Sequence, residues 1–454
     1  MSLDLDTIRR LVTNCDPQTP LPPGSPLYVP LDRDPPVRGE RASIDHLHRT
    51  ILHADRESCQ LFTGFPGTGK TTELRRLAQR FNEGQAPKAG HVVLIDFNDY
   101  INRFQPVSIS DVLRVLTYCL VHEADRVEAK LAPELYGERY LRTFFKGIKK
   151  VLPTGAALKD VEFEVFGATL MLEMRNNQTI RDQIEKGVLA RFQHFVEECR
   201  SFMKESIERI RKAEGGRADR FIVIADGLEK LDAIDERNRD VVENAIESLF
   251  IGHSEFLRLP CHVIYTFPSW LRFRTAQLGS AYSCEPLCLP MIKVHERADD
   301  GSRTPHEPGL AKLYEMISRR LVDPARIFGD DPQAALRPLL AASGGFPRDA
   351  LRMVRNILQL EENFPVSAAV VEREIRNLRQ SYHDTVLGTY TELLDQIDRT
   401  GQIPNSDIAA LRHFGHLFSR FLILAYRNGK EWFDLHPLIR DAPALVARFG
   451  KRGA

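Results

Sequence analysis

The sequence predicts an α/β fold with a doubly wound parallel sheet, followed by an all-helical lid domain and a C-terminal winged helix. Short, almost continuously apolar runs separated by helical segments predict the sheet, because parallel strands covered on both faces have this composition. These runs are residues 58–64, 91–97, 221–226 and 262–266, with a short fifth at 287–290. Asn428-Gly429 between two apolar runs predicts the hairpin of the winged helix, since both turn residues need a positive φ.

Composition narrows the class of protein. The chain has 454 residues, 43% hydrophobic and 27% charged, as in soluble globular proteins. Its 62 basic and 62 acidic residues cancel, which argues against a function driven mainly by charge on nucleic acid or a membrane surface. We expect a cytoplasmic protein, because no apolar run approaches the roughly 18 residues of a membrane span and the start lacks a signal-peptide core. Seven scattered cysteines without a CxxC pair argue against a disulfide framework or a zinc site.

The chain divides into four predicted parts. The first, 1–40, is an extended segment, because residues 17–36 are rich in proline. The α/β domain follows over 41–308, and the lid over 309–380 shows helical periodicity with no convincing strand. The winged helix occupies 381–454, with helices expected at about 383–398 and 406–414.

The stretch between the second and third strands is too long for one crossover helix, so residues 98–220 are predicted to contain an insertion. Two alternating segments at 161–166 and 169–174 predict a hairpin about Gly167. Apolar residues spaced along 180–210 predict a single helix of about 30 residues packed along the domain.

One motif carries chemistry. Residues 64–71 fit the phosphate-binding loop GxxxxGK[ST], after a strand and before a helix, so the core is predicted to be of the P-loop NTPase type. Its glycines let backbone N–H groups surround phosphates at the positive end of the helix. The expected cofactors are ATP, with Lys70 at the terminal phosphates, and Mg²⁺, ligated by the Thr71 hydroxyl. The predicted nucleotide-binding residues are Gly64, Phe65, Pro66, Gly67, Thr68, Gly69, Lys70, Thr71 and Thr72.

Acidic residues after the third strand are the candidates for metal binding and water activation. Asp226 closes that strand, where a carboxylate would hold the hydration shell of magnesium. Many ATPases of this type have Glu next, but Gly227 follows here and the nearest acid is Glu229. Glu229 either orients the attacking water or is a solvated loop charge. This departure predicts slow turnover.

Two further residues are candidates for sensing the γ-phosphate. Thr266 ends the fourth strand and either polarises the water or is a threonine at home in a strand. Arg348 follows Gly344-Gly-Phe-Pro347, which ends one helix and begins another. A cation in the first turn of a helix interacts unfavourably with the helix dipole unless an anion pairs with it, and a phosphate would be such an anion. The alternative is a plain helix start with a surface arginine.

Taken together, the order of these elements resembles STAND ATPases, signal-transducing relatives of AAA+ and origin-initiator ATPases. Gly344–Pro347 resembles their GxP motif, which implies that Pro347 lies near adenine, and Gly345–Leu351 resembles the sensor-2 pattern GxxRxAL around Arg348. Val37-Arg-Gly-Glu-Arg41 resembles the segment that opens such domains; Arg41 is the arginine we assign to nucleotide, although Arg38 flanks the same Gly-Glu pair. The resemblance covers roughly residues 28–440.

The resemblance implies a nucleotide-operated switch, in which ATP or ADP controls assembly or a separate effector or sensor protein, in bacterial defence or signalling. A homo-oligomer is an expected state. The alternative is an AAA+-like ATPase acting on DNA, as an initiator or loader, through its winged helix. From Ser381 to Ala454, nine Lys or Arg face eight Asp or Glu, too little positive charge to favour duplex binding. A small-molecule kinase would leave the two C-terminal domains without a role.

Overall fold

The computed structural model describes nine ranges of the chain. They are residues 3–40, 42–85, 89–131, 175–215, 220–233, 236–275, 277–298, 300–403 and 408–450. The hairpin predicted about Gly167 and the predicted nucleotide contact of Arg41 lie outside these residues.

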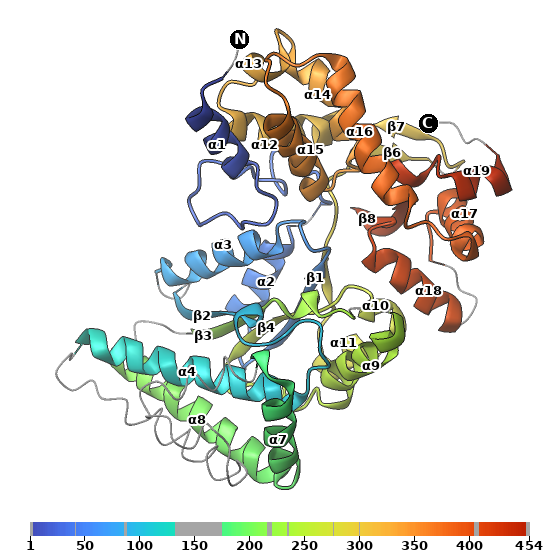
Figure 1. Ribbon diagram of the computed structural model, residues 1–454. Helices are drawn as coiled ribbons and strands as arrows, with labels where there is room; N and C mark the ends of the chain where they lie inside the picture. Colours follow the sequence, from blue (N-terminus) through green and yellow to red (C-terminus); the bar gives the residue numbers. More distant parts are fainter. Residues whose placement is uncertain are drawn as a thin grey trace.

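A five-stranded parallel sheet forms the centre of the α/β domain (Figure 1). The strands are β1 (Cys59–Gly64), β2 (Gly90–Asp96), β3 (Arg220–Asp226), β4 (His262–Thr266) and β5 (Leu287–Leu289). They are ordered β2-β3-β4-β1-β5, and all neighbours are parallel. The predicted parallel sheet is therefore confirmed, and the carboxyl ends of β3, β4 and β1 lie side by side at one edge.

Helices cover both faces of this sheet, as a doubly wound fold requires. On one face, α2 (Ser43–Leu52) and α3 (Lys70–Asn82) pack on side chains such as Ile222 and Ile224 of β3. On the other face, the alternate side chains Val223 and Ala225 of β3 are buried under several helices. These are α4 (Ile109–Leu131), α8 (Phe192–Ala213), α9 (Glu236–Glu247), α10 (Leu271–Arg274) and α11 (Leu278–Tyr282). Alternation of the buried side chains fixes the register, because a one-residue shift would exchange the two faces.

The single long helix predicted over 180–210 is wrong. The chain forms α7 (Gln178–Leu189) and α8, separated by a turn at Arg191, whose backbone is not helical (φ −138°, ψ 37°). The apolar residues recur every four positions at first, a spacing that drifts around a straight helix. The turn lets α7 bury Ile184 and Val188 while α8 separately buries Cys199 and Met203 against α4.

A helical region lies above the carboxyl edge of the sheet in Figure 1, where the lid was predicted. It comprises α12 (Glu307–Leu321), α13 (Ala325–Phe328), α14 (Pro332–Ala342), α15 (Pro347–Leu360) and α16 (Ala368–His383). A small hairpin of β6 (His295–Arg297) and β7 (Arg303–Pro305), absent from the prediction, precedes it. Its short strands carry no hydrophobic alternation that a sequence pattern could detect.

The C-terminal region has the predicted helices and hairpin. α17 (Thr391–Thr400) and α18 (Ile408–Ser419) precede β8 (Ile423–Asn428) and β9 (Lys430–Leu435), which pair antiparallel about Gly429, and α19 (Pro443–Phe449) follows. The helix predicted over 383–398 is wrong in its start. α16 extends to His383, and α17 begins only at Thr391, because the β-branched pair Thr385-Val386 and Gly388 interrupt the helix between them.

The predicted extended segment over 1–40 needs a correction at its start. Residues 5–14 form α1 (Leu5–Asn14), capped by the Asp4 side chain and packed on α12 and α15, while no helix or strand forms in 16–40. One hydrophobic core joins α1, the lid helices and the C-terminal region, and it includes Phe65 from the α/β domain. Through Phe65, and through Phe273 of α10, this core ties the lid and the C-terminal region to the α/β domain.

None of the described helices is long and apolar enough to cross a membrane. The seven cysteines form no disulfide.

Candidate functional site

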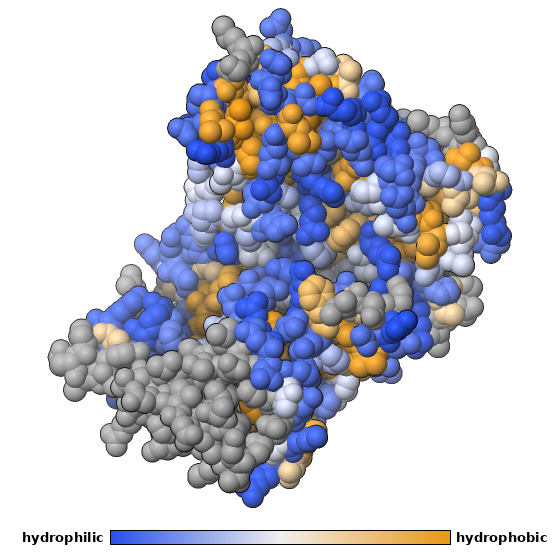
Figure 2. Space-filling model, in the orientation of Figure 1, coloured by the Kyte–Doolittle hydropathy of each residue, from blue (hydrophilic) through white to orange (hydrophobic). Residues whose placement is uncertain are grey.

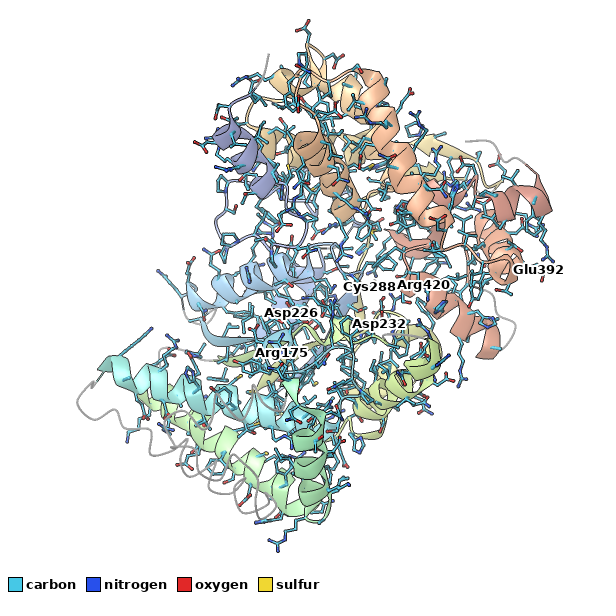
Figure 3. The ribbon with its side chains drawn as sticks, viewed as in Figure 1. Arg175, Asp226, Asp232, Cys288, Glu392 and Arg420 are labelled. Carbon is cyan, nitrogen blue, oxygen red and sulfur yellow. The ribbon has the colours of Figure 1, made fainter. Side chains whose placement is uncertain are left out.

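A cavity of about 880 Å³ lies between the carboxyl edge of the sheet, the N-terminal segment and the lid. Its walls come from residues 16–31, Arg38, the loop between β1 and α3, the loops after β2, β3 and β4, helices α12 and α15, and residues 419 and 421 of the C-terminal region. Figure 3 places Asp226 and Asp232 at this edge of the sheet, and hydrophilic side chains border the hollow in Figure 2. The cavity thus joins parts of the chain as far apart as Asp16 and Phe421.

The loop at 64–71 has the backbone of a phosphate cradle. Gly64, Gly67 and Gly69 have φ of 150°, 97° and 97°, values that favour glycine. α3 begins at Lys70, so its unpaired N–H groups and positive dipole end face the cavity. The predicted residues from Phe65 to Thr72 all line the cavity, whereas Gly64 does not; a Cβ on Gly64 would lie 2.9 Å from the Leu289 carbonyl oxygen.

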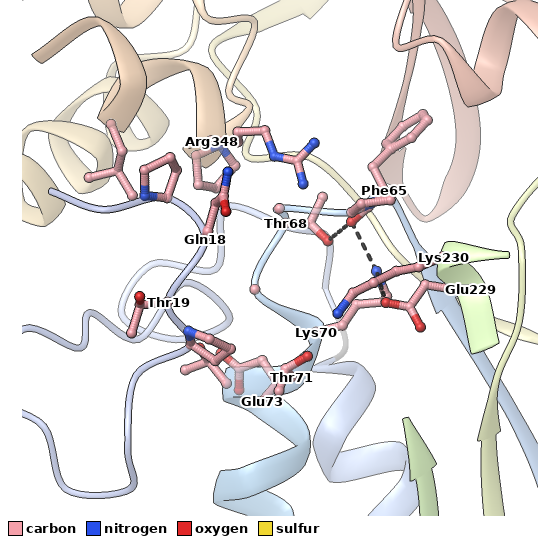
Figure 4. A pocket seen from close by; sticks show the side chains of 18 of the residues that line it. Gln18, Thr19, Phe65, Thr68, Lys70, Thr71, Glu73, Glu229, Lys230 and Arg348 are labelled. Carbon is pink, nitrogen blue, oxygen red and sulfur yellow. Dashed lines mark hydrogen bonds and ion pairs between the residues drawn. The ribbon is translucent and has the colours of Figure 1, made fainter. Parts of the chain in front are cut away.

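Lys70 is buried and already paired (Figure 4). Its Nζ donates to the carbonyl oxygens of Gly64 at 2.9 Å and Phe65 at 3.0 Å, and lies 3.4 Å from Oε1 of Glu229. Burial alone would raise the pKa of Glu229, but the charge of Lys70 and the Thr266 hydroxyl outweigh it and leave the pKa below its usual range. Glu229 is therefore an ionised, buried carboxylate at the loop, not a solvated charge.

Thr71 and Asp226, the predicted magnesium ligands, are in direct contact. The Thr71 hydroxyl donates to Oδ2 of Asp226 at 2.6 Å. Burial and the neighbouring charge of Glu229 raise the pKa of Asp226 to about 6. A hydroxyl and a carboxylate at this distance match the oxygen ligands that magnesium takes beside a phosphate.

The geometry at Gly227 explains why no glutamate follows Asp226. Gly227 has φ of 95°, and a Cβ there would lie 2.8 Å from Oδ1 of Asp96 and closer still to the amide of Asn98. Its N–H donates to Oδ1 of Asp226 and to Oε2 of Glu229, at 2.9 and 3.1 Å. The turn therefore brings Glu229 back to the end of β3. Asp96 ends β2 and Asn98 follows it, and neither was foreseen as part of this edge.

Thr266 does not line the cavity. It is fully buried at the end of β4, where its hydroxyl donates to the Ala225 carbonyl at 3.3 Å and helps to keep the pKa of Glu229 low. Its contact is with Glu229 and not with the cavity, so a direct role at the γ-phosphate is not supported.

Arg348 lies against the phosphate-binding loop, on the opposite side from Lys70 in Figure 4. It is the second residue of α15, and a Cβ on Gly67 would lie 2.5 Å from its Nε. Its guanidinium lies 5.8 Å from the centre of the Phe346 ring and 5.6 Å from that of Phe421. Arg348 thus touches the α/β domain, the lid and the C-terminal region at one point, with Pro347 beside it in the cavity wall.

The segment at 37–41 contributes Arg38 to the cavity. Arg38 is 3% exposed, and its Nη2 donates to the Thr68 carbonyl at 2.7 Å, which braces the loop. Its buried Nε has no partner among the described residues. The sequence pattern had indicated this segment without distinguishing its arginines, and Arg38 is the one that the structure describes at the loop.

Sequence reasoning missed the part played by the N-terminal segment. Leu21 N–H donates to the Thr72 hydroxyl at 3.1 Å, and the Tyr28 hydroxyl donates to Glu73 at 3.0 Å, so the segment is fastened to α3. On the other side of the N-terminal segment, Arg320 of α12 donates to the carbonyl oxygen of Leu27. Prolines indicate extended backbone but not where it runs, so no signal could have shown that this segment walls the cavity.

The residues fit ATP and magnesium. The glycine cradle, the helix N-terminus, Lys70 and Arg348 suit phosphates, and the unpartnered Nε of Arg38 can take a further acceptor. Apolar side chains suit a base on the N-terminal and lid side of the same cavity: Leu27, Val29, Leu31, Met316 and Leu351.

Comparison with known proteins gives distant likeness only. No known family and no curated protein matches this chain. Among solved structures, a Cdc6 protein from Pyrobaculum aerophilum matches with 10% identity and a TM-score of 0.35 over 98% of each chain. An ORC2 protein from Aeropyrum pernix, solved in complexes with ADPNP and ADP, matches with 14% identity and a TM-score of 0.36 over 96% of this chain and 94% of the other. Both scores are below 0.5, so the assignment of a function rests on the cavity of this chain alone.

Proposed function

We propose that this chain is a magnesium-dependent ATPase of the P-loop type that works as a slow nucleotide switch. The supporting observation is the Thr71–Asp226 contact of 2.6 Å beside a glycine cradle, a paired Lys70 and an arginine from the lid. Magnesium would be held by Thr71 and Asp226, and would neutralise the charge of the β- and γ-phosphates.

Glu229 is the proposed general base. In the described conformation it is held by Lys70, so it becomes available to a water only when the phosphates take Lys70 over. Thr266 and Gly227 position its carboxylate from behind. Because activation of the base depends on this exchange of partners, we expect binding to precede chemistry by a conformational step and turnover to be slow.

The switch would act through the lid and the C-terminal region. Arg348 and Phe421 lie in the same cavity wall as the loop, so a nucleotide that draws Arg348 toward its phosphates also pulls on both regions. A separate effector or sensor protein, a homo-oligomer, and a place in bacterial defence or signalling remain part of this proposal.

The test is equilibrium binding of ATP and ADP to the full chain, with and without magnesium, followed by measurement of phosphate release. We expect both nucleotides to bind, ATP to need magnesium for its tightest binding, and release to be slow. Absence of binding at millimolar nucleotide would overturn the proposal.

The DNA-acting alternative uses the same nucleotide cavity, but it requires α18 to be free to contact DNA. In a winged helix the helix before the hairpin faces DNA, and here α18 packs on α10, with Gly415 so close that a Cβ would lie 3.3 Å from Cβ of Trp270. This contact covers the Gly415 face of α18, whereas Arg412 and His413 of the same helix are exposed, so it is the low net charge of residues 381–454 that favours the switch. Duplex binding measured by anisotropy with ADP and with a slowly hydrolysed ATP analogue discriminates the two: tight, salt-dependent binding would favour the alternative.

A further inference from the structure

The cavity holds more positive charge than the phosphate-binding loop explains. Lys70 is paired with Glu229, and Arg38 and Arg320 donate to main-chain carbonyls. Three other arginines in the wall have side chains that form no hydrogen bond or ion pair with any residue in the described part of the chain. They are Arg103, Arg348 and Arg352, here called the cavity arginines.

The cavity arginines approach from two sides. Arg103 lies in the loop after β2 with its guanidinium 4.5 Å from the centre of the Phe104 ring. Its carbonyl accepts from the N–H of Asp232 at 3.0 Å, which joins this loop to the one that carries Glu229. Arg348 and Arg352 are one turn apart on α15, on the same face of the helix. Arg103 is therefore fixed to the sheet side of the site, and the other two to the lid side.

Arginines that line the same cavity from two sides are stabilised when an anion binds between them. Burial lowers the pKa of Arg348; the neighbouring charge of Asp349 raises it, while the charges of Arg352 and Arg103 lower it, so both arginines lie within electrostatic range of Arg348. Asp16, an acid on the N-terminal wall of the cavity, is paired with Arg355. An anion that enters the cavity relieves this repulsion and draws the two sides together.

We propose that Arg103 is a specificity-determining residue that binds the terminal phosphate of a nucleoside triphosphate from the sheet side, opposite Arg348, so that the site distinguishes ATP from ADP within one chain. This inference rests on the proposed function. The loop backbone would contact phosphates common to both nucleotides and Lys70 would reach the terminal ones; the cavity arginines line the opposite side of the loop, where the third phosphate of ATP would add charge.

The test is calorimetric binding of ADP and of a slowly hydrolysed ATP analogue, each with magnesium, to the wild type and to Arg103→Ala. We expect Arg103→Ala to weaken binding of the ATP analogue by about tenfold and that of ADP by less than twofold. Arg103→Lys should recover part of the loss, and the loss should shrink at high salt, because Arg103 is exposed. Arg56→Ala removes an exposed arginine of the same domain that lies outside the cavity, and serves as the matched control.

The outcomes separate the two proposals. If the wild type binds neither nucleotide, the proposed function fails and this inference fails with it. If the wild type binds both and Arg103→Ala weakens both equally, or weakens neither, the proposed function stands and the role of Arg103 is wrong. Loss of the ATP preference in Arg103→Ala but not in Arg56→Ala supports it.

Discussion

The two walls of the cavity differ in whether their polar side chains already have partners. The sheet wall contains Lys70, Thr71 and Glu229, with the buried Asp226 behind Thr71, and the polar groups of these residues are satisfied by one another. The lid wall presents Arg348 and Arg352, whose side chains form no hydrogen bond or ion pair among the described residues, although the charge of Asp349 acts on Arg348. The sheet wall is therefore preorganised for phosphate and magnesium, while the lid wall is complete only when an anion arrives. Nucleotide binding should accordingly change the conformation of the sheet wall little and that of the lid wall much.

The largest expected effect is on chemistry at the sheet wall. Glu229→Gln should lower phosphate release by about 10²–10⁴-fold, because it removes the proposed base. Nucleotide affinity should stay equal or rise, since Glu229 competes with phosphate for Lys70. Glu285→Gln, at an exposed position of the same domain, is the control. A rate equal to that of the wild type would show that Glu229 only holds Lys70 in place.

The second-largest effect is expected on the affinity for nucleotide. Lys70→Ala should weaken binding of ATP with magnesium by about a hundredfold, measured by calorimetry, because charge-assisted hydrogen bonds to phosphate are lost. The variant also leaves the Glu229 carboxylate buried without its counter-charge, which destabilises the fold. The double variant Lys70→Ala/Glu229→Gln restores stability without restoring affinity. Unchanged affinity in the double variant would contradict the site.

A pH effect of about tenfold should come from Asp226. Its pKa of about 6 means that the ionised fraction falls about tenfold between pH 7 and pH 5, and magnesium needs the ionised form. The magnesium-dependent part of ATP affinity should therefore decrease as the pH falls through 6. Because the nucleotide itself titrates nearby, Asp226→Asn supplies the baseline. Parallel pH profiles for the wild type and Asp226→Asn would contradict the prediction.

The smallest effect concerns the link between the walls. Phe65 of the loop lies 4.3 Å in ring distance from Phe418 of α18 and 5.6 Å from Phe421. Phe65→Leu should cost about 1 kcal/mol of this contact, seen as faster amide hydrogen exchange in α18. Phe256→Leu removes a ring packed edge-on against Phe192 elsewhere in the domain, and should leave α18 unaffected. Unchanged exchange in both variants would show that the ring contact does not couple the regions.

The sequence predicts more of the sheet wall than of the lid wall. Strands, the phosphate-binding loop and Asp226 were predictable, because each depends on local periodicity or on a contiguous motif. The placement of Glu229 was not, since it depends on the turn at Gly227, where φ is 95° and where Asp96 and Asn98, from the end of β2 and the turn after it, leave no room for a Cβ. A pattern in one segment cannot report the side chains that a second segment brings against it.

The lid wall was predictable only in part. Arg348 was identified from the helix start around it, but Arg103 belongs to a loop without a motif. The break between α7 and α8 and the course of residues 16–31 also depend on tertiary contacts. Such contacts join residues far apart in sequence, so single-sequence patterns do not carry them.

The most direct test of the account is small-angle scattering of the full chain with ADP and then with a slowly hydrolysed ATP analogue, for the wild type and for Arg348→Ala. Arg348 touches the loop from the lid, and a charge-assisted contact of about 1.5–3 kcal/mol shifts a closed–open equilibrium by tenfold or more. The account predicts different scattering profiles for the two nucleotides in the wild type, and one profile for both in Arg348→Ala, which still binds nucleotide. The same nucleotide-dependent difference in the variant, or none in the wild type, would contradict it.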